Sequence, residues 1–329
     1  MRESELKVLE QYEIDVTNTR KVREGVLCET SKGLFLLKEL RVSEKRLDVL
    51  DTVCHHLKEQ GYPNVDWILK TGEGTLFSTS EDGIKYVVKR WFAGKECDIH
   101  REKDVLDGVR NLANVHLAFR GLYIDNVTSA EDMREEYFRH NREMKKVRSF
   151  MRNKPDKGEF ELSFLKNFDA MYADADAALS LLNDSCYGDL FQKHKEEHIL
   201  VHGDYNYHNI LITYDGMATT NFEHVATNIQ VTDFYYYLRK VMEKNRWNIS
   251  LGDKMIECYQ KYLPFQEGEL TYIAISLAYP EKFWKVANSY SRSRKVWIPA
   301  KNLEKLELVI KQTEEKKVFL ENLFSFHLT

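Results

Sequence analysis

A short stretch near the middle of the chain combines an acid and an amide in a way that suits phosphoryl transfer. An apolar run at residues 199–201 leads into His202-Gly203-Asp204, four residues follow, and Asn209 precedes a second β-rich run at residues 210–212. Transfer of a phosphoryl group to a hydroxyl needs a proton acceptor beside the attacking oxygen and an oxygen ligand for the bridging metal. Asp204 is therefore the predicted catalytic base, and Asn209 the predicted catalytic amide and metal ligand. The alternative is a purely structural turn, because short patterns recur by chance.

Elements that would position this loop can be recognised on both sides of it. Residues 26–30 and 34–38 are β-rich and flank a Ser-Lys-Gly turn, which predicts a hairpin. Residues 43–60 place apolar side chains at helical spacing after a Ser43 cap, which predicts a helix. We therefore expect an α+β fold, with a β-rich N-terminal lobe containing one helix at residues 1–92. A helical C-terminal lobe that contains the loop hairpin would follow at residues 93–329.

Composition and charge argue against several classes of protein. The 329 residues carry a formal net charge of -4, whereas a dedicated nucleic-acid binder usually has a strong basic excess. The five cysteines form no C-x-x-C pair, so neither a disulfide framework nor a zinc site is predicted. A charged N-terminus and the lack of a long uncharged apolar run predict synthesis in the cytoplasm and no membrane contact. Small molecules or proteins are the expected partners.

Several motifs make the chain similar to known phosphotransferases. The frame H-x-D-x-x-x-x-N at residues 202–209 resembles the catalytic loop of protein kinases, and Gly203 points to the aminoglycoside phosphotransferase and choline kinase group. At residues 201–211, 220–223 and 234–245 the chain resembles the CotS family of spore-coat-associated, kinase-like proteins of endospore-forming bacteria. The resemblance implies a bilobal protein-kinase-like fold, binding of ATP or GTP with Mg²⁺, and residence in the spore coat.

The resemblance also assigns a role to Lys38. A kinase places a lysine at the end of the third strand, where it neutralises the inner phosphates of the donor, and Lys38 matches that position. Its partner acid would lie on the helix at residues 43–60, where Asp48 and Asp51 are candidates and Glu44 is a weaker one. The alternative for each of these side chains is a solvated charge.

Two further segments would contact the nucleotide. A strand ends at Arg90, Trp91 and Phe92, which match the interlobe hinge of kinases. The hinge backbone would contact the edge of the base while an aromatic ring covers its face, although an ordinary strand end would look similar. A glycine-rich cover over the phosphates is replaced by a turn with a single glycine. Charge would come instead from the basic side chains near this turn: Arg20, Lys21 and Arg23.

The second metal ligand departs from the kinase pattern. Kinases place an Asp about a dozen residues after the Asn of the loop, and this chain has Asn221 there. Mg²⁺ favours carboxylates, so a neutral amide weakens the predicted site. On a strand over residues 219–223, Glu223 would project to the same face as Asn221 and reach the metal. A competing register uses Asp233, but a structural acid at the start of a helix fits Asp233 better.

Two functions from different classes remain open. The first is a spore-coat-associated O-phosphotransferase that depends on ATP and Mg²⁺ and acts on an unidentified hydroxyl acceptor. The second is a catalytically weak or inactive kinase-like protein that serves the structure or assembly of the coat, with other coat proteins as partners. Asn221 and the missing glycines favour the second function. An antibiotic-modifying kinase ranks last, because the mixed-charge helices show no clear acidic cleft for a polycationic substrate.

Overall fold

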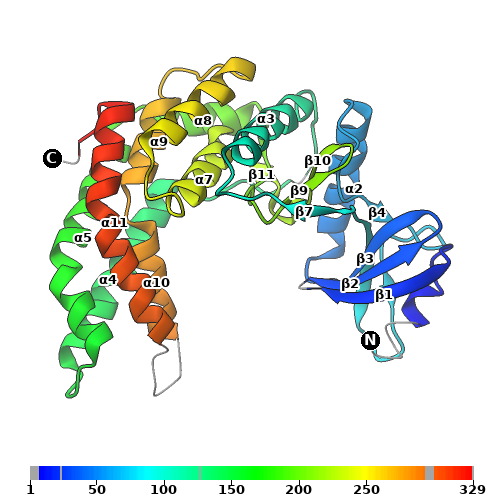
Figure 1. The fold of residues 1–329 in the computed structure, drawn as a ribbon, viewed down its shortest axis with the longest axis horizontal. Coiled ribbons are helices and arrows are strands. Elements are labelled where there is room, and N and C mark those ends of the chain that lie inside the picture. The colour runs from blue at the N-terminus through cyan, green and yellow to red at the C-terminus, as the bar shows by residue number, and fades with distance from the viewer. Residues whose placement is uncertain (1–6, 23, 126, 293–299, 328–329) are drawn as a thin grey trace. The chain divides into compact units, whose positions relative to one another are not determined.

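The chain forms two units that each combine two separate segments (Figure 1). The computed structural model describes residues 7–22, 24–125, 127–292 and 300–327. The first unit comprises Met1–Thr128 and His198–Asp233, and the second comprises Ser129–Glu197 and Phe234–Thr329. The lobe boundary predicted after residue 92 falls inside the first unit, just after the end of its larger sheet. That boundary stays a prediction.

An antiparallel sheet forms much of the N-terminal segment of the first unit. The strand order is β1-β2-β3-β6-β4, with β5 paired to β6 beside this path. The predicted hairpin is confirmed, because β2 and β3 pair in register from Val26 opposite Leu37 to Thr30 opposite Gly33. The strands are β1 Val16–Val22, β2 Gly25–Thr30, β3 Gly33–Glu39, β4 Ile68–Leu69, β5 Ser78–Thr79 and β6 Lys85–Arg90.

Helix α2, Glu44–Glu59, shares a hydrophobic core with this sheet and with the C-terminal segment of the unit. Its predicted cap is confirmed, because Ser43 Oγ accepts a hydrogen bond from the backbone N–H of Arg46 at 3.3 Å. Apolar side chains at helical spacing enter a core that also contains Val87 of β6 and Phe222. This shared core fixes the turn around Phe222 against α2, and that turn carries two of the predicted site residues.

The central loop lies between short strands of the same unit. Strand β8 precedes the loop and pairs with β11, whereas β9 follows it in a sheet of order β10-β9-β7. The strand predicted over residues 219–223 is wrong beyond Thr219, because Asn221 has a left-handed backbone (φ 65°, ψ 52°). The elements here are β7 Gly94–Glu96, α3 Glu102–Ala118, β8 Leu200–Val201, β9 Ile210–Thr213, β10 Gly216–Thr219, the 3-10 turn η1 Phe222–His224 and β11 Ala226–Thr227.

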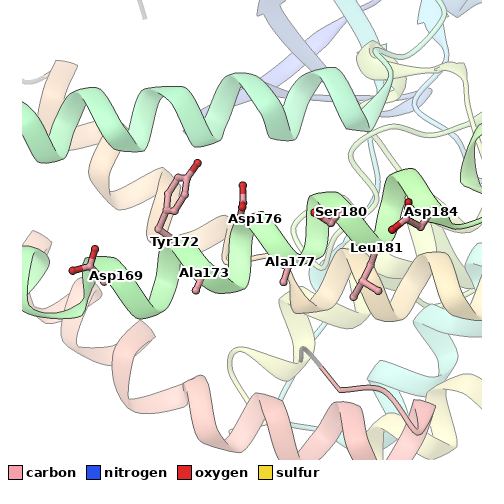
Figure 2. A pocket seen from close by; sticks show the side chains of 8 residues that line it. All are labelled: Asp169, Tyr172, Ala173, Asp176, Ala177, Ser180, Leu181 and Asp184. Atoms are coloured by element: carbon pink, nitrogen blue, oxygen red, sulfur yellow. The ribbon is translucent and has the colours of Figure 1, made fainter.

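The described part of the second unit is helical. Stacked aromatic rings join its helices, for example Tyr137 on Tyr279 with ring centroids 3.7 Å apart. A shallow groove of about 440 Å³ runs along α5 and is lined by side chains of that helix, three of them aspartates (Figure 2). The helices are α4 Met133–Asn153, α5 Glu159–Asp184, α6 Tyr187–Glu196, α8 Ile249–Tyr262, α9 Glu269–Ala278, α10 Glu281–Arg292 and α11 Ala300–Phe324.

Helix α7, Val231–Met242, begins in the first unit and continues into the second. Its first turn carries Asp233, as predicted for a structural acid that begins a helix. Within the ranges that the structure describes, every helix is too short or too polar to span a bilayer.

Candidate functional site

Asp204 lies in the loop between β8 and β9, where two side-chain amides hold its carboxylate. Asn209 Nδ2 donates to Asp204 Oδ2 at 2.9 Å, and Asn206 Nδ2 donates to Oδ1 at 2.9 Å. The same two nitrogens also donate to the backbone carbonyl of Asp204, at 2.8 Å and 3.0 Å respectively. A carboxylate oxygen can accept more than one hydrogen bond. The half-buried carboxylate is therefore fixed in one orientation and retains capacity for a further donor.

His202 holds the backbone of this loop from the buried side. Its Nε2 lies 3.0 Å from the carbonyl oxygen of Thr220, and its Nδ1 accepts the backbone N–H of Asp204 at 3.2 Å. A carbonyl only accepts hydrogen bonds, so Nε2 carries the proton and Nδ1 is the free base. Burial lowers the pKa of His202, and the neutral ring that this arrangement requires is therefore the favoured form at pH 7.

Asp233 supports the loop through its carboxylate. It accepts the backbone N–H groups of His202 at 2.6 Å and Gly203 at 2.9 Å. His116 Nε2 lies 3.2 Å from Asp233 Oδ2, and both side chains are buried. The competing register, with Asp233 as the metal acid, is therefore wrong, because its oxygens hold the loop. His116 thus contacts the acid that supports the loop.

Position 203 requires glycine because its backbone is left-handed and because a backbone carbonyl lies close to it. Its φ is 79°, and an added Cβ would lie 2.1 Å from the carbonyl oxygen of His224. We expect Gly203→Ala to lower the free energy of unfolding by at least about 2 kcal/mol, measured by urea denaturation, because left-handed strain and a backbone clash add. Gly83 is a matched control with φ 80° and no atom within 4 Å, so Gly83→Ala should cost only about 1–2 kcal/mol. Equal losses in the two variants would contradict the clash.

A hydrogen bond between two amides joins the loop to the turn after β10. Since Asn209 Nδ2 donates to Asp204, Asn209 Oδ1 faces the turn and accepts Asn221 Nδ2 at 2.8 Å. The backbone N–H of Asn221 donates to Asp66 Oδ2 at 3.0 Å. Asn221 Oδ1 is buried and has no hydrogen-bond partner among the residues that the structure describes. These hydrogen bonds run in one direction, from Asn221 through Asn209 to Asp204.

Lys38 on β3 pairs with Glu223 of the turn η1. Its Nζ lies 2.8 Å from Glu223 Oε1 and 3.7 Å from Glu24 Oε2. The side chains of Lys38 and Glu223 are 14 % and 20 % exposed, so both remain within reach of a ligand. The expected reach of Glu223 towards a metal beside Asn209 rested on an extended strand. The 3-10 turn directs its carboxylate to lysine instead.

The prediction that an acid on α2 pairs with Lys38 is wrong. Asp51 pairs with Lys70 at 3.3 Å, and Glu44 pairs with Lys85. Asp48 makes no ion pair with Lys38 among the contacts of the described residues. Helix α2 contacts the site through a basic side chain instead.

Arg46 is the residue through which α2 contacts the site. Its Nε and Nη2 donate to the backbone carbonyl of Glu223 at 3.1 Å and 3.0 Å, and Nη2 also contacts the carbonyl of Val225. A planar guanidinium suits such multiple donation in a fixed geometry. Glu223 is thus held by its main chain from α2 and by its side chain from the sheet.

A buried ion pair between Lys89 and Asp66 lies beside Glu223 and was not predicted from the sequence. Lys89 Nζ is 3.1 Å from Asp66 Oδ2 and 3.4 Å from Glu223 Oε1. Lys89 and Asp66 are 3 % and 1 % exposed. Burial opposes the charge on Lys89, but Asp66 and Glu223 outweigh it and raise the pKa of Lys89. The available sequence signal was a lysine directly after two valines on β6.

The ion pairs of Glu223 predict an acid-dependent stability. Burial acts to raise the pKa of Glu223, but Lys89 and Lys38 outweigh it, so the folded pKa is lowered. The stabilisation is thus fully present above the unfolded pKa, about 4.3, and is lost as pH falls through the folded value. We expect Glu223→Gln to lower the melting temperature at pH 7 and the gap from wild type to shrink below about pH 4.

Glu39 provides the control for this acid-dependent gap. It is exposed at the end of β3, the strand that carries Lys38. Thermal melts of Glu39→Gln should follow wild type across the same range of pH. A gap for Glu223→Gln that stays constant down to pH 3 would contradict the role of the ion pairs.

The predicted hinge residues lie at the end of β6. The backbone N–H of Trp91 donates to the carbonyl of Leu34 at 2.9 Å, so this donor is already used. The Arg90 guanidinium lies 5.6 Å from the centre of the Phe92 ring. The rings of Trp91 and Phe92 are half-buried. Contact of these residues with a nucleotide stays a prediction.

Of the basic residues expected to cover the phosphates, Arg20 and Lys21 are exposed on β1, and Arg23 lies outside the described residues.

The residues brought together here do not fit a Mg²⁺ ion. Mg²⁺ takes an octahedral set of oxygens and usually at least one carboxylate. Asn209 Oδ1 already accepts a hydrogen bond, and the carboxylate of Glu223 is paired with two lysines. Asn221 Oδ1 is a buried oxygen of the predicted set without a hydrogen-bond partner among the described residues, and both lysine contacts of Glu223 use Oε1. Among the described residues there is no group of three or more histidines, cysteines or acids that could hold a metal.

Solved structures of phosphotransferases share this fold. An aminoglycoside phosphotransferase from Alicyclobacillus acidocaldarius is similar with a TM-score of 0.86 and 19% identity, covering 97% of this chain and 95% of that one. Spectinomycin phosphotransferase APH(9)-Ia, in complex with ADP and spectinomycin, is similar at 0.67 and 12% identity, covering 95% and 96%. Amicoumacin kinase hAmiN, in complex with AMP-PNP, Ca²⁺ and Ami, is similar at 0.60 and 12%, covering 98% and 94%.

These similarities confirm the predicted α+β, protein-kinase-like fold class. A search of curated proteins found no match. The model of one family, described as "Spore coat putative kinase YutH", matches residues 5–323. The expected resemblance to spore-coat-associated, kinase-like proteins is thereby confirmed, and the chain belongs to the family that this model describes.

Proposed function

We propose that the protein is an O-phosphotransferase of the spore coat that moves a phosphoryl group from a nucleotide to a hydroxyl acceptor. One observation carries the proposal: an unbroken series of hydrogen bonds and ion pairs connects Asp204 to Lys38. It passes, in order, through Asn209, Asn221, Asp66, Lys89 and Glu223. A proton acceptor and a phosphate-binding lysine therefore belong to one rigid network. Family membership and the nucleotide-bound phosphotransferases of the same fold support the proposal.

Asp204 would act as the proton acceptor for the attacking hydroxyl. Its carboxylate is oriented by Asn206 and Asn209 and keeps capacity for one more donor. Because phosphoryl transfer depends mostly on positioning and charge stabilisation, an oriented carboxylate is the part that the protein itself must supply. Asn206 and Asn209 are positioning residues in this scheme, since they act through Asp204.

Lys38 would meet the phosphates of the donor, which is ATP or GTP. Its ammonium group is partly exposed and has Glu223 as its near partner, so the phosphates would compete with Glu223 for this lysine. The base would lie against the hinge at Trp91 and Phe92, using backbone groups other than the N–H of Trp91. Mg²⁺ would neutralise phosphate charge if it bound, but it stays a prediction that the donor set does not support.

The alternative is a kinase-like coat protein with weak or absent catalysis, which contacts other coat proteins. The observation that favours it is the pairing of Lys38 and Lys89 with Glu223, because the lysine predicted to bind phosphate already has a carboxylate partner. The two functions share the fold and the family. They differ in whether a nucleotide enters the site and reacts there.

A nucleotide titration followed by a transfer assay separates the two functions. Wild-type protein should melt at a higher temperature with millimolar ATP or GTP, since a ligand that binds only the folded state stabilises it. γ-labelled nucleotide should then transfer label to an acceptor in a panel of coat and cell extracts. No change in melting temperature together with no transfer of label would leave the structural role in the coat as the function.

A further inference from the structure

We propose that the side-chain amide of Asn221 does in this protein what a metal ion would otherwise do, so that the loop is assembled and the nucleotide is bound without a divalent cation. The statement about nucleotide rests on the proposed function. The statement about the loop does not, because it concerns only hydrogen bonds within the first unit. The proposal accounts for the poor fit of the donor set to Mg²⁺.

The direction of the hydrogen bonds carries the first step. Asn209 must turn its NH₂ group towards Asp204, where the carboxylate and the backbone carbonyl both accept. Asn209 Oδ1 consequently faces the turn and needs a positive partner there. Asn221 Nδ2 supplies that partner at 2.8 Å. The amide hydrogen thus occupies the place in which a cation would contact the oxygen of Asn209.

An aspartate at position 221 would replace this hydrogen bond to Asn209 with a repulsive contact. A carboxylate has no hydrogen to donate, so it would set a negative oxygen against Asn209 Oδ1 and also lie close to Asp66, which accepts the backbone N–H of residue 221. A cation between the oxygens would then be needed. The backbone itself would not resist the change, since Asn and Asp both tolerate the left-handed conformation found here.

The charges next to Asn221 are the second observation that supports the proposal. Lys89 lies between Asp66 and Glu223, and Lys38 also contacts Glu223. Two lysines therefore balance the charges of Asp66 and Glu223. A divalent cation is attracted to a site with excess negative charge, and these two carboxylates with their two lysines carry none. The partly exposed ammonium group of Lys38 is then the cation that a phosphate would meet.

The test uses Mn²⁺ alone, so that it does not depend on nucleotide. Wild type should show no saturable binding by electron paramagnetic resonance or calorimetry. Asn221→Asp should gain a saturable site whose affinity for Mn²⁺ is at least tenfold above the nonspecific binding of wild type. Without metal, Asn221→Asp should melt lower than wild type by at least about 4 °C, and Mg²⁺ or Mn²⁺ should restore most of this loss. Asn322→Asp is the matched control, because Asn322 is exposed on α11 and the change adds the same charge.

Two results would overturn the proposal. The first is saturable Mn²⁺ binding by wild type that Asn221→Ala removes, and this readout does not require the aspartate variant to fold. The second is an Asn221→Asp variant that folds and yet binds no more Mn²⁺ than Asn322→Asp.

The nucleotide statement has its own measurement. ATP binding to wild type, measured by calorimetry, should agree within about threefold between EDTA and excess Mg²⁺. Binding that requires Mg²⁺ would overturn the inference while leaving the proposed function intact. If ATP binds in neither condition, the proposed function and the nucleotide statement both fail, and the Mn²⁺ results still decide the role of Asn221.

Discussion

Replacing Asp204 with Asn is expected to reduce phosphoryl transfer at least about 100-fold, the usual contribution of a positioned general base. The change removes the proton acceptor and one of the two side-chain hydrogen bonds that Asn206 and Asn209 donate, because an amide has a single oxygen. Asn206 and Asn209 each donate to the backbone carbonyl of residue 204 as well as to its side chain, so two of the four hydrogen bonds that they donate to this residue do not depend on the carboxylate. The fold and the nucleotide site should therefore persist.

Two measurements on the same preparation check this expectation. The rate of label transfer should fall, while the dissociation constant of the nucleotide stays within about threefold of wild type, as expected for an interaction made mainly in the transition state. Asp215→Asn is the matched control, because Asp215 is exposed in the turn between β9 and β10. Full turnover in Asp204→Asn would show that another group takes the proton.

Replacing Lys89 with Met is expected to destabilise the folded protein by about 3–5 kcal/mol, the cost of leaving a buried charge without its partner. Methionine keeps most of the volume of the lysine stem. It removes the ammonium group that neutralises Asp66, which is 1 % exposed. Glu223 keeps Lys38 as a partner, so most of the loss should come from Asp66. Urea denaturation of the two proteins gives the difference directly.

A double variant shows whether the charge on Asp66 causes this loss. When Lys89→Met is combined with Asp66→Asn neither position is charged, and the amide introduced at position 66 still offers an oxygen to the backbone N–H of Asn221. We expect this variant to recover a large part of the lost stability, because uncharged buried side chains need no counter-ion. Lys85→Met is the control on the same strand, where the side chain is 42 % exposed and its ion pair should contribute at most about 1 kcal/mol. A double variant no more stable than Lys89→Met alone would refute the ion-pair explanation.

The parts of the fold that sequence predicted correctly depend on local spacing. β-rich residues on both sides of a glycine turn predicted the hairpin β2–β3, and a serine before apolar residues at helical spacing predicted α2. The fixed frame from His202 to Asn209 predicted one short loop between two strands that holds an acid and an amide, and in the structure these two side chains hydrogen-bond directly. Each of these features lies within one short stretch of the chain, so the sequence suffices.

The parts that sequence missed depend on residues far apart or on a single backbone angle. Asp66 and Asn221 are separated by 155 positions, and nothing local to either residue indicates that they meet. Lys89 looks like an ordinary strand lysine until β4 and the turn η1 enclose it. The failure at Glu223 had a different cause, because one left-handed residue, Asn221, ended the strand and redirected the following carboxylate.

The site is divided between two stretches of chain that are far apart in the order of synthesis. Lys38, Asp66 and Lys89 come from the stretch before residue 129, whereas the residues from Asp204 to Glu223 come from the stretch after residue 197. A nascent chain therefore exposes both lysines on the ribosome long before Glu223 has been made. The N-terminal sheet is synthesised before α4 to α6, whereas Glu223 is synthesised after them. A chain truncated before Glu223 therefore leaves Lys38 and Lys89 without this carboxylate partner.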